Sequence, residues 1–531
     1  MVNNFNDIVI TLNSLPLGRT EKNSPTYLSS GNPCLDFFFH VVPDTPASYI
    51  CQQLPMAWSH DPLTTLKLIC NLRFYTAAYW LFHNHPKTLG CNVASFAEFR
   101  YFKDLIEIMY RVLEGPDVRE VQKAKWLRWK ERSVGVAAAS AARVSDLFVD
   151  CLKTDIDSLK DTSSSSKYKE ITLAAKWCPS LNASFDRSTL LCESIARKLF
   201  PRESYPEYPG MEEEEYLHKV RHRLRKEILL PLRKAMDFPE IYIAAKQWDS
   251  IPYNRGKFLE YDGERFRKYL EDVKAGKAKI AAGALLQHEI VAQLNIGNYY
   301  GQACAEEDYE VASLQWRRIV DDLLKQGKMK NCLAVCDVSE SMVGSLMDVS
   351  VALGLLVSEL NEEPWKGKII TFSRQPQLHL VKGDDFRSKW KFIREMEWGM
   401  NTDFQKVFDL ILQVAVNGRL KPKHMIKRIF VFSDMEFDQA SSNSWETDYE
   451  AIQRKFKEKG YEEAVPQIVF WNLRHSSSTP VSNTQRGVAL LSGYSKNLMK
   501  LFLNYEGEVH PELIMELAIS GEEYQSLTVV D

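Results

Sequence analysis

The stretch Asn331-Cys-Leu-Ala-Val-Cys-Asp-Val-Ser-Glu-Ser341 joins a short apolar run to a polar turn. Leu333 to Cys336 has the length and the bounds of a buried strand, and the run ends at Asp337. Ser339 and Ser341 follow at alternate positions, so a loop can turn one carboxylate and two hydroxyls toward one point. Hard divalent cations such as Mg2+ prefer oxygen ligands of this kind. The simpler alternative is that Asp337 and Ser339 cap the following helix.

The sequence after Gln326 alternates apolar runs with helical patterns. Strands are expected at 333–336, 368–372, 429–432, 468–471 and 488–491, with helices between them. Leu378 and Leu380 alternate with polar residues, which is typical of an antiparallel edge strand. The alternation predicts an α/β domain with a doubly wound, mostly parallel sheet, covered by helices.

The sequence before that point is helical in pattern. Two polar connections interrupt it, one near 161–167 that is rich in serine and one at 201–215 that carries proline, glycine and glutamate. Many helices without strand signals predict an all-helical, solenoid-like domain. Residues 1–29 show little periodicity, and we expect a poorly ordered leader there. The predicted division is a leader at 1–29, a helical domain at 30–325 and an α/β domain at 326–531.

The composition excludes several classes of protein. Of the 531 residues, 45% are hydrophobic and 26% are charged, as in soluble globular proteins. The net charge of -3 argues against nucleic-acid binding over the whole surface. No apolar run approaches the ~20 residues of a membrane span, and the N-terminus lacks the features of a signal peptide. The ten cysteines form no Cys-x-x-Cys pair, so we expect reduced core thiols in a protein of the cytoplasm or nucleus.

Two later segments add oxygen atoms to the same predicted edge of the sheet. Asp434 follows the apolar strand that ends at Phe432, and Thr402 lies in the loop that opens the preceding helix. In the usual strand order, the strands that end at Asp337 and Asp434 are neighbours at the point where ligands bind. Thr402 has a second explanation, because Thr402-x-x-Gln405 is also a capping box.

Five residues together resemble the metal-ion-dependent adhesion site of von Willebrand factor type A (vWA) domains: Asp337, Ser339, Ser341, Thr402 and Asp434. The resemblance covers roughly the last 200 residues. It implies that these five are cation ligands, with Mg2+ as the metal and Mn2+ or Ca2+ as alternatives. It also implies that the acidic side chain of a partner fills an open coordination position. Two acids beside the site, Glu340 and Glu436, are expected to be exposed loop side chains.

The whole chain also resembles a plant family of unknown function, domain of unknown function 2828, which ends in a vWA domain. The resemblance is carried by Ser29–His40, Asp61–Thr64 and Trp248–Arg255. The layout is similar to that of the Ro autoantigen, in which a helical (TROVE) ring that binds RNA precedes a vWA domain. Two joins, near Arg73 and Arg255, are shorter than in the family and lack basic, glycine-containing segments. Their shortness would weaken RNA binding.

A basic stripe at 219–234 supplies the candidate RNA contacts: Arg221, Arg225, Arg233 and Lys234. A solvated helix face is the alternative, because Glu227 and upstream glutamates offset the charge. His218 and His222 stand four residues apart, but Lys219 occupies the position where a zinc-protease helix needs glutamate. The sequence has neither a Gly-x-Gly-x-x-Gly cradle nor a Gly-x-Ser-x-Gly elbow, so we expect no nucleotide cofactor and no catalysis.

The sequence therefore predicts a non-enzymatic, intracellular interaction or scaffold protein. It would bind an acidic group of a protein partner through a Mg2+-loaded adhesion site. The first alternative is a Ro-like RNA-binding protein that uses its helical domain. The second is a metal-dependent hydrolase that uses a cation-bound water. No membrane association is expected, and the sequence identifies neither the partner, the pathway nor the oligomeric state.

Overall fold

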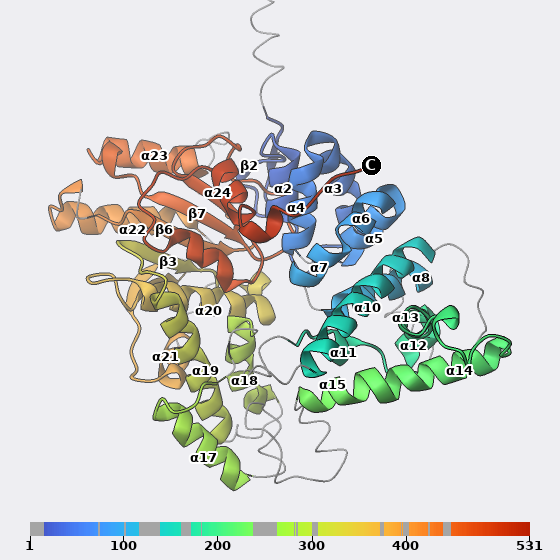
Figure 1. The fold of residues 1–531 in the computed structure, drawn as a ribbon. Coiled ribbons are helices and arrows are strands. Elements are labelled where there is room, and N and C mark those ends of the chain that lie inside the picture. The colour runs from blue at the N-terminus through green and yellow to red at the C-terminus, as the bar shows by residue number, and fades with distance from the viewer. Residues whose placement is uncertain are drawn as a thin grey trace, which may run out of the picture. The chain divides into compact units, whose positions relative to one another are not determined.

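The computed structural model of the chain describes residues 15–72, 75–99, 102–115, 138–160, 171–181, 183–236, 263–280, 282, 285–299, 306–371, 376–394, 396, 403–422, 425–438 and 448–531. Thr402, the loop near 161–167, Trp248–Arg255 and the joins near Arg73 and Arg255 lie outside these ranges in whole or in part. The chain forms two compact units (Figure 1). The first unit is Met1–His60 with Gly263–Ser520, and the second is Asp61–Asp262 with Gly521–Asp531.

A six-stranded sheet is the centre of the first unit, with the order β5-β4-β3-β6-β7-β8. Its strands are β3 (Cys332–Cys336), β4 (Lys368–Thr371), β5 (Gln377–Leu380), β6 (Arg428–Ser433), β7 (Gln467–Asn472) and β8 (Val488–Ser492). β5 pairs antiparallel with β4, and the other neighbours pair in parallel. The doubly wound, mostly parallel sheet with one antiparallel edge strand is thus confirmed.

Helices cover both faces of this sheet (Figure 1). On one face lies α20 (Ser345–Leu360), where Ser350 Oγ donates to the carbonyl of Phe432 at 3.2 Å. On the other face lies α22 (Phe404–Asn417), where the ring of Phe404 packs 5.6 Å from that of Phe470. Because both faces are covered, β3 and β6 are buried at every residue, which is why β3 and residues 429–432 of β6 are apolar runs.

The other helices of the first unit are α2 (Pro33–His40), α3 (Ala47–His60), α17 (Gly263–Lys274), α18 (Gln287–Tyr299), α19 (Glu306–Leu324), α21 (Phe386–Arg394), α23 (Asp448–Glu458) and α24 (Pro511–Ala518). Both α18 and α19 pack on α20, and both α2 and α24 pack on β8. The compact unit therefore draws in helices from both ends of the predicted 30–325 domain, and its bounds differ from the predicted 326–531.

The N-terminal hairpin, Leu17–Tyr27, also belongs to this unit. Its strands are β1 (Leu17–Arg19) and β2 (Pro25–Tyr27), which pair antiparallel. Thr26 Oγ1 and the Tyr27 amide both donate to the carbonyl of Thr479 at 3.0 Å. The expectation of a poorly ordered leader at 1–29 is wrong for residues 15–29, because polar side chains of this segment bond to groups more than 400 residues away.

The described residues of the second unit form helices and connecting turns, and no strand. Its helices are α4 (Pro62–Leu72), α5 (Tyr75–Asn84), α6 (Pro86–Cys91), α7 (Val93–Phe99), α8 (Phe102–Glu114), α10 (Ala138–Lys160), α11 (Ala174–Trp177), α12 (Ser184–Thr189), α13 (Leu191–Leu199), α14 (Glu213–Arg223) and α15 (Leu230–Ala235). A π-helical segment, Leu224–Leu229, joins α14 to α15. Pro231, the second residue of α15, lacks the amide that a regular helix would use there.

Candidate metal centre

Two carboxylates meet at the carboxyl ends of β3 and β6. The two strands pair in parallel, with Cys336 opposite Phe432. Asp337 follows β3, and its amide donates to the carbonyl of Phe432 at 3.0 Å. Asp434 follows β6, and both aspartates are 0% exposed. The pairing of two central strands therefore brings two buried acids to one edge of the sheet.

The turn after β3 holds the Asp337 carboxylate and presents hydroxyl oxygens beside it. The Ser339 amide donates to Asp337 Oδ1 at 2.9 Å, and Ser433 Oγ donates to Asp337 Oδ2 at 2.6 Å. The hydroxyl oxygens of Ser339 and Ser341 lie 3.0 Å apart. The hydrogen bonds fix the carboxylate, and the two serine hydroxyls add neighbouring oxygen donors.

The loop after β6 orients Asp434. Its Oδ1 accepts from the Glu436 amide at 3.1 Å, and its Oδ2 lies 3.5 Å from Nη1 of Arg474. Arg474 follows β7 and is 34% exposed in its side chain. The sequence does not predict Ser433 or Arg474 as residues of this site. Ser433 precedes the predicted ligand Asp434, but no motif around Arg474 indicates that it lies near the site.

The two neighbouring buried carboxylates, Asp337 and Asp434, favour the binding of a cation. Burial and, after it, the neighbouring Asp434 carboxylate raise the pKa of Asp337 to about 6, although hydrogen bonds from Ser433 and Ser339 lower it. Like charges held together in a buried site are costly unless a positive charge offsets them. The donor set of carboxylate and hydroxyl oxygens fits a hard divalent cation such as Mg2+.

Four of the five predicted ligands lie together at this edge: Asp337, Ser339, Ser341 and Asp434. The fifth, Thr402, is outside the described residues. Among the residues that the structure describes, no group of three or more His, Cys, Asp or Glu side chains is suited to a metal. A cation here would therefore depend on the serine hydroxyls as well as the carboxylates.

The two neighbouring acids differ from each other. Glu340 is exposed, as predicted. Glu436 is 3% exposed, so the prediction of an exposed loop acid is wrong for it. Its Oε2 accepts from the Glu21 amide at 2.5 Å and its Oε1 from Ser478 Oγ at 2.9 Å, while burial raises its pKa. Glu436 fastens the N-terminal hairpin to the loop that carries Asp434.

Two of the four candidate RNA contacts bind other groups of the second unit. Arg221 donates to the buried Asp186 at 2.8 Å. Arg233 donates to the carbonyls of Ala175 and Cys178 at 2.9 and 2.7 Å, at the end of α11. Arg225 and Lys234 are exposed. Two arginines of the basic stripe, Arg221 and Arg233, therefore stabilise the fold of the helical unit.

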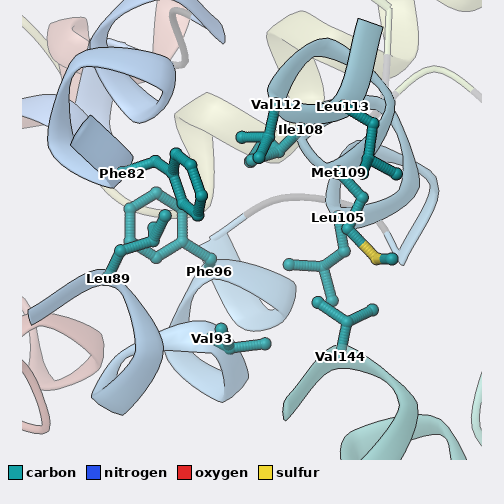
Figure 2. A pocket seen from close by; sticks show the side chains of 10 residues that line it. All are labelled: Phe82, Leu89, Val93, Phe96, Leu105, Ile108, Met109, Val112, Leu113 and Val144. Atoms are coloured by element: carbon teal, nitrogen blue, oxygen red, sulfur yellow. The ribbon is translucent and has the colours of Figure 1, made fainter. Parts of the chain in front are cut away.

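A pocket in the second unit has a wholly apolar lining (Figure 2). Phe82, Phe96, Leu105 and Met109 are among the side chains that point into it. None of its lining residues can ionise or donate a hydrogen bond from its side chain. The pocket therefore offers no groups for acid–base or metal chemistry.

The helices in the described part of the chain include none with the length and apolar character of a membrane span.

The fold and the site define a two-unit protein, with a helical unit and an α/β unit that gathers buried acids at one edge of its sheet. Residues 20–142 and 136–329 match the family model described as Domain of unknown function (DUF2828). These matches span more than half of the chain, so the chain belongs to the DUF2828 family, and the predicted family is confirmed. Residues 331–527 match the model described as Domain of unknown function (DUF7788).

Two individual proteins are similar to the chain. Uncharacterized protein L728 of Acanthamoeba polyphaga mimivirus is 31% identical over 520 residues, which cover 92% of this chain and 85% of that protein. The crystal structure of the Deinococcus radiodurans RO (RSR) protein matches with a TM-score of 0.38 and 13% identity, over 93% of this chain and 100% of that chain.

Proposed function

We propose that the chain is a non-enzymatic interaction protein that binds a divalent cation, Mg2+, at the edge that carries Asp337 and Asp434. The observation that carries the proposal is the pair of fully buried carboxylates on adjacent central strands, with the hydroxyls of Ser339 and Ser341 beside them. Such a pair is costly unless positive charge offsets it, and the Arg474 guanidinium offsets only part of the charge, at Asp434. Thr402 is the proposed fifth ligand.

The bound cation would supply an attachment point for an oxyanion of a partner protein. Asp337 is suited to holding the metal, because both of its oxygens are oriented by hydrogen bonds from Ser339 and Ser433. Each oxygen accepts one of these hydrogen bonds and keeps a second lone pair, which a bound cation would use. The partner ligand in this proposal is an aspartate or glutamate side chain, whose carboxylate would fill an open position on the cation.

A partner screen with the full-length chain tests this proposal. Binding in the presence of Mg2+ should be lost with EDTA and with Asp337→Ala, and it should persist with Asp448→Asn. Asp448 is the matched control, since it is also a buried acid with a raised pKa in the first unit. Changing the partner's acid to its amide should also abolish binding.

Two other results would favour the alternatives. A partner that binds equally well with EDTA and to Asp337→Ala would contradict the cation-dependent site. RNA retention that survives Asp337→Ala, weakens steeply with salt and requires Arg225 and Lys234 would favour RNA binding by the helical unit. Turnover of phosphoesters only with added Mg2+ or Mn2+ would favour the hydrolase.

A further inference from the structure

One guanidinium nitrogen lies between two carboxylates beside the candidate site. Nη1 of Arg474 is 3.5 Å from Oδ2 of Asp434 and 3.7 Å from Oε2 of Glu21. Asp434 is fully buried, whereas the side chain of Glu21 is 68% exposed. Arg474 therefore has an inner partner that is a proposed cation ligand and an outer partner at the surface.

The backbones of both side chains are held in place near this edge. The Arg474 amide donates to Oδ1 of Asn472, the last residue of β7, at 3.2 Å. The Glu21 amide donates to Glu436, and Thr20 Oγ1 donates to the carbonyl of Phe437 at 2.9 Å. The N-terminal hairpin is thus fastened to the loop that begins with Asp434, and Glu21 is kept within reach of Arg474.

We propose that Arg474 competes with the divalent cation for Asp434, and that Glu21 receives the guanidinium when the cation binds. The N-terminal hairpin then sets the cation affinity of the site. This inference rests on the proposed function, because it assumes that Asp434 is a cation ligand. Arg474 and Glu21 are positioning residues here, since neither is proposed to contact the metal.

The physical reason is charge repulsion at one carboxylate. A guanidinium at Asp434 offsets part of the negative charge that would attract the cation, and it repels the cation directly. Arg474 must therefore move outward as the cation enters, and the Glu21 carboxylate stabilises that outward position. Solvent screens Glu21, so its effect is expected to be smaller than that of Arg474.

The test is Mn2+ binding to the full-length chain, followed by the electron paramagnetic resonance signal of free Mn2+. Arg474→Gln should tighten Mn2+ binding, by about tenfold if the charge acts at a partly buried site. Glu21→Gln should weaken it by about threefold. In a double-mutant cycle, Glu21→Gln should have little effect once Arg474 is Gln, because Glu21 acts through the guanidinium.

Glu340→Gln is the matched control, because Glu340 is an exposed acid between two proposed ligands, Ser339 and Ser341. Its effect on Mn2+ affinity should be equal in the presence and absence of Arg474. An affinity that does not rise in Arg474→Gln, or an effect of Glu21→Gln that is equal in both backgrounds, would overturn the inference. Failure of every variant to bind Mn2+ would instead overturn the proposed function. Binding that appears only in Arg474→Gln would support the competition and contradict the proposed function.

Discussion

Asp448 is a buried acid of the first unit that lies outside the candidate site. Its Oδ2 accepts from Ser24 Oγ at 3.0 Å and its Oδ1 from Gln405 Nε2 at 2.8 Å. Burial raises its pKa from the ordinary 3.8 to about 6, although both hydrogen bonds lower it. Hydrogen bonds alone therefore do not offset the loss of water around this carboxylate, and the charged form is costly in the folded state.

Asp448→Asn is expected to remove this cost. Because the pKa is higher in the folded than in the unfolded chain, the wild type loses stability as pH rises from about 4 to about 6. The loss is at most ~3 kcal/mol for a shift of this size. The variant lacks this titration, so its melting temperature relative to wild type should rise over the same interval. A difference in melting temperature between Asp448→Asn and wild type that stays constant from pH 4 to pH 7 would contradict a raised pKa for Asp448.

The close packing of α20 on β3 depends on Gly354. A Cβ atom at this position would lie 2.1 Å from Sγ of Cys336 and 3.7 Å from Cβ of Ala334. The absence of a side chain therefore lets the helix approach the strand whose end carries Asp337. This is a packing requirement and does not depend on backbone conformation.

Gly354→Ala is expected to destabilise the first unit by about 1–3 kcal/mol, the usual cost of overpacking a core. Cys336→Ala should restore part of the loss in the double variant, because it removes the clashing sulfur. Chemical denaturation of the two single variants and the double variant measures the coupling. Strict additivity of the two changes would show that the predicted clash does not limit the packing.

Buried polar contacts, such as the hydrogen bond from Ser24 to Asp448, hold the N-terminal hairpin in place. Ser24→Ala removes the hydroxyl that Asp448 accepts from and should lower stability by about 1–3 kcal/mol. The rate of amide hydrogen exchange at the start of α23 should increase in this variant. Glu21→Gln is the control and should melt like wild type, since the hairpin is fastened by the Glu21 backbone amide. Equal melting of Ser24→Ala and wild type would contradict this account of the hairpin.

The sequence predicts some of these elements much better than others. The sequence predicts β3 and β6 because strands covered on both faces carry apolar runs, here all of β3 and residues 429–432 of β6. Asp337 and Asp434 could be brought together because parallel strands end at the same edge. The sequence does not indicate the N-terminal hairpin, because each of its strands has only three residues. Its partners, such as Thr479, are more than 400 residues away. The burial of Glu436 depends on the same distant hairpin, so the residues around Glu436 do not indicate it.

At the scale of the whole molecule, the compact units and the family matches divide the chain differently. The DUF2828 matches end at residue 329. The first unit nevertheless includes α2, α18 and α19, which lie within those matches. α20 is buried at 12 of its residues, more than a helix on an open sheet face would need, because α18 and α19 cover its outer side. The α/β fold therefore depends on helices that precede it.

A fragment of residues 326–531 is accordingly expected to be unstable. It would expose the outer side of α20 and the surface of β8 on which α2 packs. Exposed apolar surfaces of this kind promote aggregation. Size-exclusion chromatography and thermal melting of the fragment and the full-length chain provide the comparison. A monomeric fragment that melts cooperatively, as the full chain does, would show that these helices are dispensable for folding.

Calorimetric titration of the full-length chain with Mg2+ tests whether a cation binds at the edge that carries Asp337 and Asp434. We expect one bound Mg2+ per chain, loss of binding in Asp337→Ala and in Asp434→Ala, and retention of binding in Asp448→Asn. Absence of Mg2+ binding by the wild-type chain, or equal binding by Asp337→Ala, would contradict this expectation.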